Sequence, residues 1–87
     1  MHAVVVRVTI SDFEPAVTAL REQVIPRVTQ VPGFVAGYWT RNGDEGLSMI
    51  VFESEEAAQQ AAERIPAVTP EAVTLDSVEV REVVANA

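Results

Sequence analysis

The sequence predicts an α+β domain with the element order strand, helix, strand, strand, helix, strand (βαββαβ). Valine-rich stretches near both ends alternate in the manner of strands, and two intervening segments repeat apolar residues at helical spacing. A polar, glycine-containing segment near the middle marks a hairpin. The 87 residues contain no internal repeat, linker or low-complexity tract, so residues 1–87 are expected to form a single domain.

The first strand is expected over residues 2–10. Side chains of a strand alternate between its two faces, so one face here is wholly apolar and the other is mixed. The apolar face carries Val4, Val6, Val8 and Ile10. The mixed face carries Ala3, Val5, Arg7 and Thr9.

The first helix is expected to begin at Ser11 or Asp12. Ser11 and Glu14 have the spacing of a capping box, and Asp12 is an alternative N-cap. Pro26 interrupts the apolar stripe, which predicts a kink or a tightened last turn. The helix should end at the Val31-Pro32-Gly33 segment. The stripe consists of Phe13, Val17, Leu20, Val24 and Val28.

A hairpin follows. The second strand is expected from Phe34 to about Arg41, and the third from Leu47 to Glu53. Residues 42–46, Asn-Gly-Asp-Glu-Gly, supply the glycines and the Asn and Asp that tight hairpin turns need.

The second helix differs from the first in the size of its apolar residues. Ser54 is its expected N-cap, and Pro66 and Pro70 are expected to end it. Its small stripe predicts close packing on the sheet, so ligand volume is expected under the first helix or between the two helices. The last strand is expected from Val73 to about Val84. The stripe consists of Ala57, Ala58, Ala61, Ala62 and Ile65.

These elements together predict a ferredoxin-like fold, an antiparallel four-stranded sheet with both helices on one face. The other face still carries apolar residues, which favours covering it. A domain of this size has a marginal core, and it has neither cysteine nor a Cys/His cluster to staple it. An obligate homodimer is therefore expected, with two sheets packed face to face and the valine-rich last strand contributing to the interface.

Two segments resemble a known family. They are Val31-Pro32-Gly33-Phe34-Val35-Ala36-Gly37-Tyr38-Trp39 and Leu47-Ser48-Met49-Ile50-Val51-Phe52-Glu53-Ser54-Glu55-Glu56-Ala57. Their pattern is similar to that of the dimeric α+β barrel superfamily, in particular its antibiotic-biosynthesis-monooxygenase-like (ABM-like) branch. The resemblance implies a dimeric α+β barrel. In quinone-forming members it also implies a phenolic substrate that reacts with oxygen without metal or flavin.

The resemblance also suggests pocket positions. Haem-degrading members place an asparagine on the first strand, a tryptophan at the end of the third and a haem-ligating histidine on the next helical segment. This chain has Arg7 and Phe52 at the first two positions and no histidine in residues 54–65. It therefore predicts no specific haem binding and no cofactor. Candidate ligand-binding residues are Arg7, Tyr38, Trp39 and Phe52, although adjacent Tyr38 and Trp39 cannot both face one cavity.

Arg7 has two interpretations. It can form a cross-strand ion pair with Glu79 of the last strand, or it can bind a ligand carboxylate or phenolate. The family comparison puts Arg7 in a pocket under the helices, whereas strand alternation puts it on the opposite face. The two placements exclude each other.

The composition limits the remaining classes of function. The net charge of −7 disfavours nucleic acid and anionic membranes as partners. No apolar run approaches a membrane span, so a cytoplasmic location is the default expectation. His2 is the only histidine and is interpreted as a surface residue rather than part of a triad, and Glu53, Glu55 and Glu56 as a solvated helix start rather than a metal site.

No catalytic residue is identified, and three hypotheses of function remain. The first is a dimer that binds a small, partly apolar molecule, as a cofactor-independent monooxygenase does. The second is a binding module without chemistry. The third is a purely structural dimer.

Overall fold

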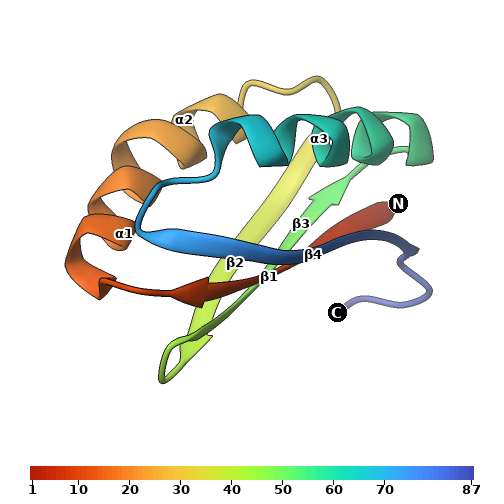
Figure 1. Ribbon diagram of the computed structural model, residues 1–87. Coiled ribbons are helices and arrows are strands. Elements are labelled where there is room, and N and C mark those ends of the chain that lie inside the picture. Colours follow the sequence, from red (N-terminus) through yellow and green to blue (C-terminus); the bar gives the residue numbers. More distant parts are fainter.

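Four strands form where the sequence alternates: β1 (His2–Ile10), β2 (Phe34–Asn42), β3 (Glu45–Phe52) and β4 (Val73–Glu82). The computed structural model describes residues 1–87 and shows these strands as one antiparallel sheet in the order β2-β3-β1-β4. All helices lie on one face of this sheet (Figure 1). The α+β class is thus confirmed, and the topology is compatible with the predicted ferredoxin-like arrangement.

The two edge strands each contain one extra residue. Arg7 is paired with Ser77 and Val8 with Leu75, so Asp76 bulges out of β4. The Asp76 carboxylate then accepts a hydrogen bond from the Thr9 hydroxyl at 2.8 Å. In β2, Phe34 is paired with Phe52 and Ala36 with Val51, so Val35 is the extra residue.

The first helical segment has three parts: α1 (Phe13–Ala19), η1 (Leu20–Val24) and α2 (Ile25–Val28). η1 is a π-helical turn in which the Ile25 N–H donates to the Leu20 carbonyl five residues earlier. The helix thus widens before Pro26, while its last turn is tightened as predicted, because the Gln30 and Val31 N–H groups donate to the Arg27 and Val28 carbonyls three residues earlier. Pro26 has no N–H to donate, and a wider turn accommodates its ring. The predicted capping box does not form either, since the Ser11 hydroxyl donates to the Ala72 carbonyl and Asp12 makes no side-chain cap.

The second helix, α3 (Glu55–Val68), begins as predicted. The Ser54 hydroxyl accepts a hydrogen bond from the Ala57 N–H at 3.1 Å, and Ala58 and Ala61 are buried against the sheet. Pro66 lies inside the helix instead of ending it. The last turn is held by the Thr69 hydroxyl, which donates to the Ile65 carbonyl at 2.7 Å.

The core lies between the helices and the sheet. It contains the helix-facing side chains of β1 and β3 together with small residues of α3 and one valine of α2. Phe52 is completely buried and meets the Phe34 ring edge-on, with centroids 6.2 Å apart. The buried members of this cluster are Val4, Val6, Val28, Ile50, Phe52, Ala58 and Ala61.

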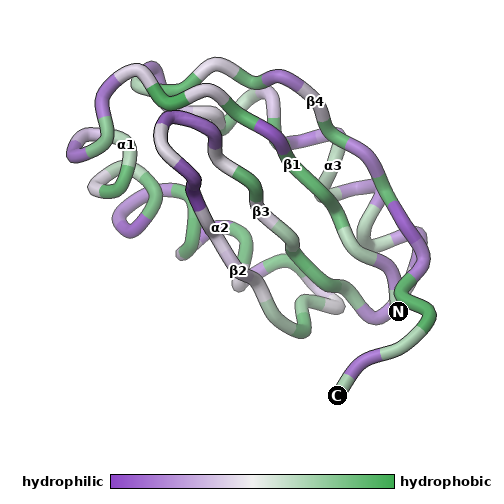
Figure 2. The backbone as a smooth tube through the Cα atoms, turned by 90° about the horizontal axis from the view of Figure 1, so that it is seen from below, coloured by the Kyte–Doolittle hydropathy of each residue, from purple (hydrophilic) through white to green (hydrophobic).

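The other face of the sheet has no covering layer; we call it the open face. Figure 2 views this face and shows hydrophobic residues along β1 and β3. Three large apolar side chains on it are exposed: Tyr38, Leu47 and Met49. Arg7 is exposed on the same face opposite Ser77, while Glu79 pairs with Arg81 at 2.9 Å. The predicted Arg7–Glu79 ion pair is therefore not formed, because Glu79, which lies opposite Val5, is paired with Arg81 instead.

Candidate functional site

A hollow lies between the first helical segment and the sheet; we call it the helix-side cavity. Its volume is about 460 Å³, and 15 of its 22 lining residues are hydrophobic. Phe13, Val17 and Leu20 line it from the helical segment, and Val8 and Trp39 line it from the sheet. Such a size and an apolar lining with a few polar groups are typical of small-molecule sites.

The cavity follows from the unequal size of the two apolar stripes. The alanines of α3 bring that helix close to the sheet, where Ala58 is fully buried. The first helical segment instead meets the sheet through larger side chains such as Phe13 and Leu20, which hold its backbone further away. The π turn η1 lies directly over the cavity and lines it with Leu20, Arg21 and Val24. Single π turns are frequent at functional sites.

Trp39 is held in the cavity wall by its own strand. A Cβ at Gly37 would lie only 2.7 Å from the Trp39 ring, so the ring covers the Gly37 backbone on the helix-facing side of β2. Glycine is therefore required at this position for the ring to lie flat on the strand. Aromatic cover of a glycine on an edge strand is a known device for stabilising sheets.

The polar side chains of the cavity are two hydroxyls and two guanidinium groups. The Thr69 hydroxyl donates to the Ile65 carbonyl, whereas the Thr40 hydroxyl lies on the open face, where it donates to the Leu47 carbonyl at 2.6 Å. Arg41 places its guanidinium carbon 3.4 Å from the centre of the Phe13 ring. Ser48 and Arg21 complete the set, and the lining contains no Asp, Glu or His. The cavity can therefore donate hydrogen bonds, but it offers no carboxylate or imidazole as a general base.

The four candidate ligand-binding residues predicted from the sequence lie on opposite faces of the sheet, two on each face. Trp39 lines the helix-side cavity, whereas Tyr38 lies on the open face with 67% of its surface exposed. The prediction that at most one of this pair faces a given cavity is confirmed. Arg7 is also on the open face, so alternation and not the family alignment located it correctly. Phe52 is a core residue with no exposed surface.

A smaller hollow of about 370 Å³ continues the cavity between α2 and α3. Val28, Ile50, Ile65 and Val68 line both hollows, so the two are neighbours across these side chains. Phe52 forms part of the wall of this second hollow. Its polar lining residues are Arg27, Gln30 and Arg64.

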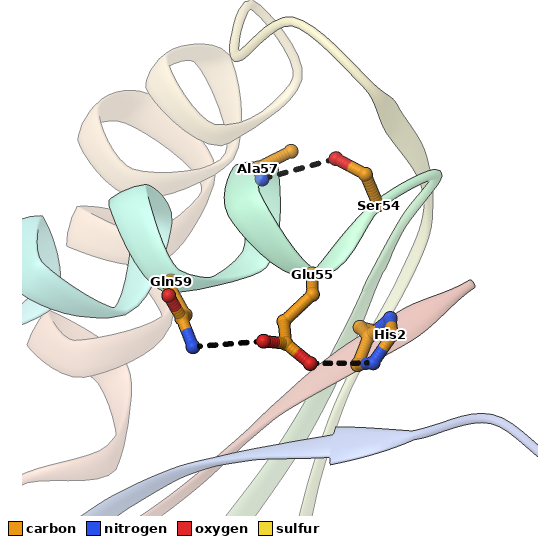
Figure 3. Close-up of polar contacts among 5 residues, drawn as sticks. All are labelled: His2, Ser54, Glu55, Ala57 and Gln59. Atoms are coloured by element: carbon orange, nitrogen blue, oxygen red, sulfur yellow. Dashed lines mark hydrogen bonds and ion pairs between the residues drawn. The ribbon is translucent and has the colours of Figure 1, made fainter.

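His2 anchors the start of β1 to α3 and forms no triad with Ser54. Its Nε2 lies 3.2 Å from a Glu55 carboxylate oxygen, and its side chain is 19% exposed (Figure 3). The Ser54 oxygen is turned to the helix N-terminus, where it caps Ala57 (Figure 3). The other Glu55 oxygen accepts from the Gln59 amide at 3.4 Å. The histidine therefore has a structural role, and its interpretation as an ordinary surface residue underestimated its burial.

Two findings concern other kinds of site. No group of three or more His, Cys, Asp or Glu side chains lies in a position to hold a metal ion, and Glu53, Glu55 and Glu56 are all exposed. No helix is both long enough and apolar enough to span a membrane.

The polar residues of the cavity were missed in the sequence, although signals for two of them exist. Arg21 follows Val17 by four residues and Phe13 by eight, so it continues the apolar stripe of the first helix. Arg41 follows Trp39 by two residues and so shares its strand face. Only the depth of the cavity, which no periodicity encodes, makes these positions significant.

No protein-family model matches the chain, and no curated protein matches it.

Proposed function

We propose that this chain is an ABM-like homodimeric barrel protein that binds a small, partly apolar molecule in the helix-side cavity. The observation that carries the proposal is the cavity itself, which at about 460 Å³ exceeds the roughly 300 Å³ at which small-molecule pockets begin. A filled interior would have favoured a purely structural dimer. The resemblance of residues 31–57 to that family supports the same conclusion.

Binding without chemistry is favoured over catalysis within this proposal. No acid, base or activated nucleophile lines the cavity, and Ser48, its one serine, has no histidine near it in the lining. The alternative is a cofactor-independent monooxygenase, in which bound phenolate reacts directly with oxygen. That alternative requires only a pocket that holds and orients the phenol.

The homodimer is supported by the open face. Tyr38, Leu47 and Met49 are exposed there, next to the small apolar residues Ala3 and Val5. Charged residues such as Glu45 and Arg81 lie towards the margins of this surface, and Arg7 lies on the central strand β1 opposite Leu47. Exposed apolar side chains with charged residues around them are typical of a protein interface, and a second copy supplies a surface of matching chemistry.

Ligand binding is tested through Trp39, the only tryptophan, which lines the cavity. Titration with a panel of phenols and naphthols should quench or shift its fluorescence in a saturable manner. The variant Val17→Phe should fill part of the cavity and weaken the effect, whereas Gln60→Ala on the exposed side of α3 should leave it unchanged. A panel without any saturable response would overturn the binding proposal.

Oxygen consumption separates the binder from the monooxygenase. Each phenol that binds is incubated with the protein in an oxygen electrode, with Val17→Phe as the matched control. A binding module gives no uptake above that of the control. Uptake that is proportional to wild-type protein and reduced in Val17→Phe would establish the enzyme.

The dimer is tested by light scattering. The wild type should show twice the chain mass of 9.4 kDa, and Met49→Lys should give monomers because it puts a charge at the centre of the open face. Gln60→Lys is the matched control and should remain dimeric. Deletion of residues 82–87 should raise the dimer dissociation constant. A wild-type monomer at micromolar concentration would refute this part of the proposal.

A further inference from the structure

Four of the six arginines of this acidic protein line its two hollows. The chain has six arginines, no lysine and 13 acidic residues. Arg21 and Arg41 line the helix-side cavity, and Arg27 and Arg64 line the adjoining hollow. None of the 13 acidic residues lines either one. Against a net charge of −7, this is the part of the molecule where positive charge is concentrated.

These four guanidinium groups have no carboxylate partner. The carboxylates in contact with basic side chains are Glu55, which contacts His2, and Glu79, which pairs with Arg81. No side-chain hydrogen bond has an arginine as its donor. A guanidinium carries five N–H donors in a planar fork that matches a carboxylate or sulfonate. The donors of Arg21 and Arg41 are therefore free for an anion at the cavity.

The Arg41 side chain is also held in place by a contact with Phe13. Its guanidinium carbon lies 3.4 Å from the centroid of Phe13, so the aromatic ring covers one face of the group. The N–H donors lie in the guanidinium plane, and stacking leaves them unoccupied. Phe13 thereby restricts the long side chain of Arg41 beside an otherwise apolar cavity, which lowers the entropy that an anion must remove on binding.

We propose that the ligand of the helix-side cavity is an apolar anion, a molecule with an aromatic or alkyl body and one carboxylate, sulfonate or phenolate group. The body occupies the apolar cavity, and Arg21 and Arg41 bind the anionic group. This inference rests on the proposed function, because it specifies the ligand class of the same cavity. Arg7 is on the opposite face and takes no part.

Two dyes of the same shape test this assignment. 1-Anilinonaphthalene-8-sulfonate is an anion, and N-phenyl-1-naphthylamine is the same molecule without its sulfonate. Both accept excitation energy from tryptophan, so transfer from Trp39 reports binding, and its loss in Val17→Phe, which fills part of the cavity, shows that the dye is bound there. Dissociation constants for both dyes are measured in the wild type, in Arg21→Met/Arg41→Met and in the control Arg7→Met. Methionine retains much of the apolar stem and removes the charge, so lost packing is separated from lost charge.

The expected result is selective. The double variant should raise the dissociation constant of the sulfonate dye by about tenfold or more, which is the range of a charge-assisted hydrogen bond. It should change the dissociation constant of the neutral dye by less than about twofold. Arg7→Met should leave both constants unchanged, and Arg21→Lys/Arg41→Lys should recover part of the affinity for the anion. Added salt should weaken the binding of the sulfonate dye only.

Two other results overturn the inference and are distinguishable. If both dyes bind and neither depends on Arg21 and Arg41, or if Arg7→Met has the same effect as the double variant, the cavity binds apolar molecules but selects no anion. The proposed function then stands and the anion assignment falls. If neither dye receives energy from Trp39, the cavity is not a binding site and both proposals fall. Circular dichroism of each variant checks that it is folded.

Discussion

The two helical segments, α3 and α1–η1–α2, cover the same face of the sheet in different ways. α3 presents alanines, caps its start with Ser54 and lies close enough to bury Ala58 completely. The α1–η1–α2 segment presents larger side chains, has no side-chain cap and contains a π turn. The helix-side cavity of about 460 Å³ lies beneath this second segment. Close packing of α3 stabilises the fold, while the looser cover of the other segment leaves volume for a ligand.

The largest expected difference in stability is between two aromatic residues of the sheet, Phe52 in the core and Trp39 in the cavity wall. Phe52→Ala should lower the free energy of unfolding by about 3 to 5 kcal/mol, because it removes a completely buried ring from the core. Trp39→Ala should cost clearly less, because the ring already faces a cavity on one side. Urea unfolding monitored by circular dichroism measures both variants. Equal losses would show that the cavity wall is packed as tightly as the core.

The same substitution at two buried alanines sharpens the comparison. Ala58 of α3 is completely buried and lines neither hollow, whereas Ala16 of α1 is buried and lines the helix-side cavity. Ala58→Leu should destabilise by about 1 to 3 kcal/mol through overpacking, whereas the added atoms of Ala16→Leu can enter the cavity at little cost. Thermal unfolding of the two variants provides the measurement. The comparison fails if Ala16→Leu is as destabilising as Ala58→Leu.

Helix caps provide a smaller effect with a matched control. Ser54→Ala should cost about 1 kcal/mol, because the hydroxyl accepts from the Ala57 N–H. Asp12 occupies the equivalent position of the first helix without a side-chain cap, so Asp12→Ala should cost only about a few tenths of that value. Denaturant midpoints of both variants, measured under identical conditions, test this difference. A larger loss of stability in Asp12→Ala than in Ser54→Ala would contradict the prediction.

The smallest effect is expected on the face that neither helical segment covers. Arg7→Met should change the free energy of unfolding by no more than about 0.5 kcal/mol, because Arg7 is exposed and has no ion-pair partner. A double-mutant cycle with Glu79→Leu measures the coupling between the two residues, which should be close to zero. A coupling energy above about 1 kcal/mol would show that Arg7 and Glu79 form an ion pair, contrary to the prediction.

Local patterns in the sequence were sufficient for the elements and for their inward faces. Alternation assigned Val4 and Val6 to the helix-facing side and Arg7 to the other side, and the structure agrees. The predicted cap at Ser54 and the alanine stripe of α3 are confirmed. These features depend on residues within a few positions of one another, so the linear order of residues determines them.

Tertiary structure alone decided the features that depend on distant residues. Glu79 lies on the same face as Arg7 but forms its ion pair with Arg81 of its own strand, which leaves Arg7 without the predicted partner. The π turn before Pro26 and the helical conformation after Pro66 reflect how the helices settle on the sheet. The cavity arises because two stripes of unequal size cover one surface. Arg21 and Arg41 become a candidate anion site only there, since the space between layers is a property of packing that residue order alone does not specify.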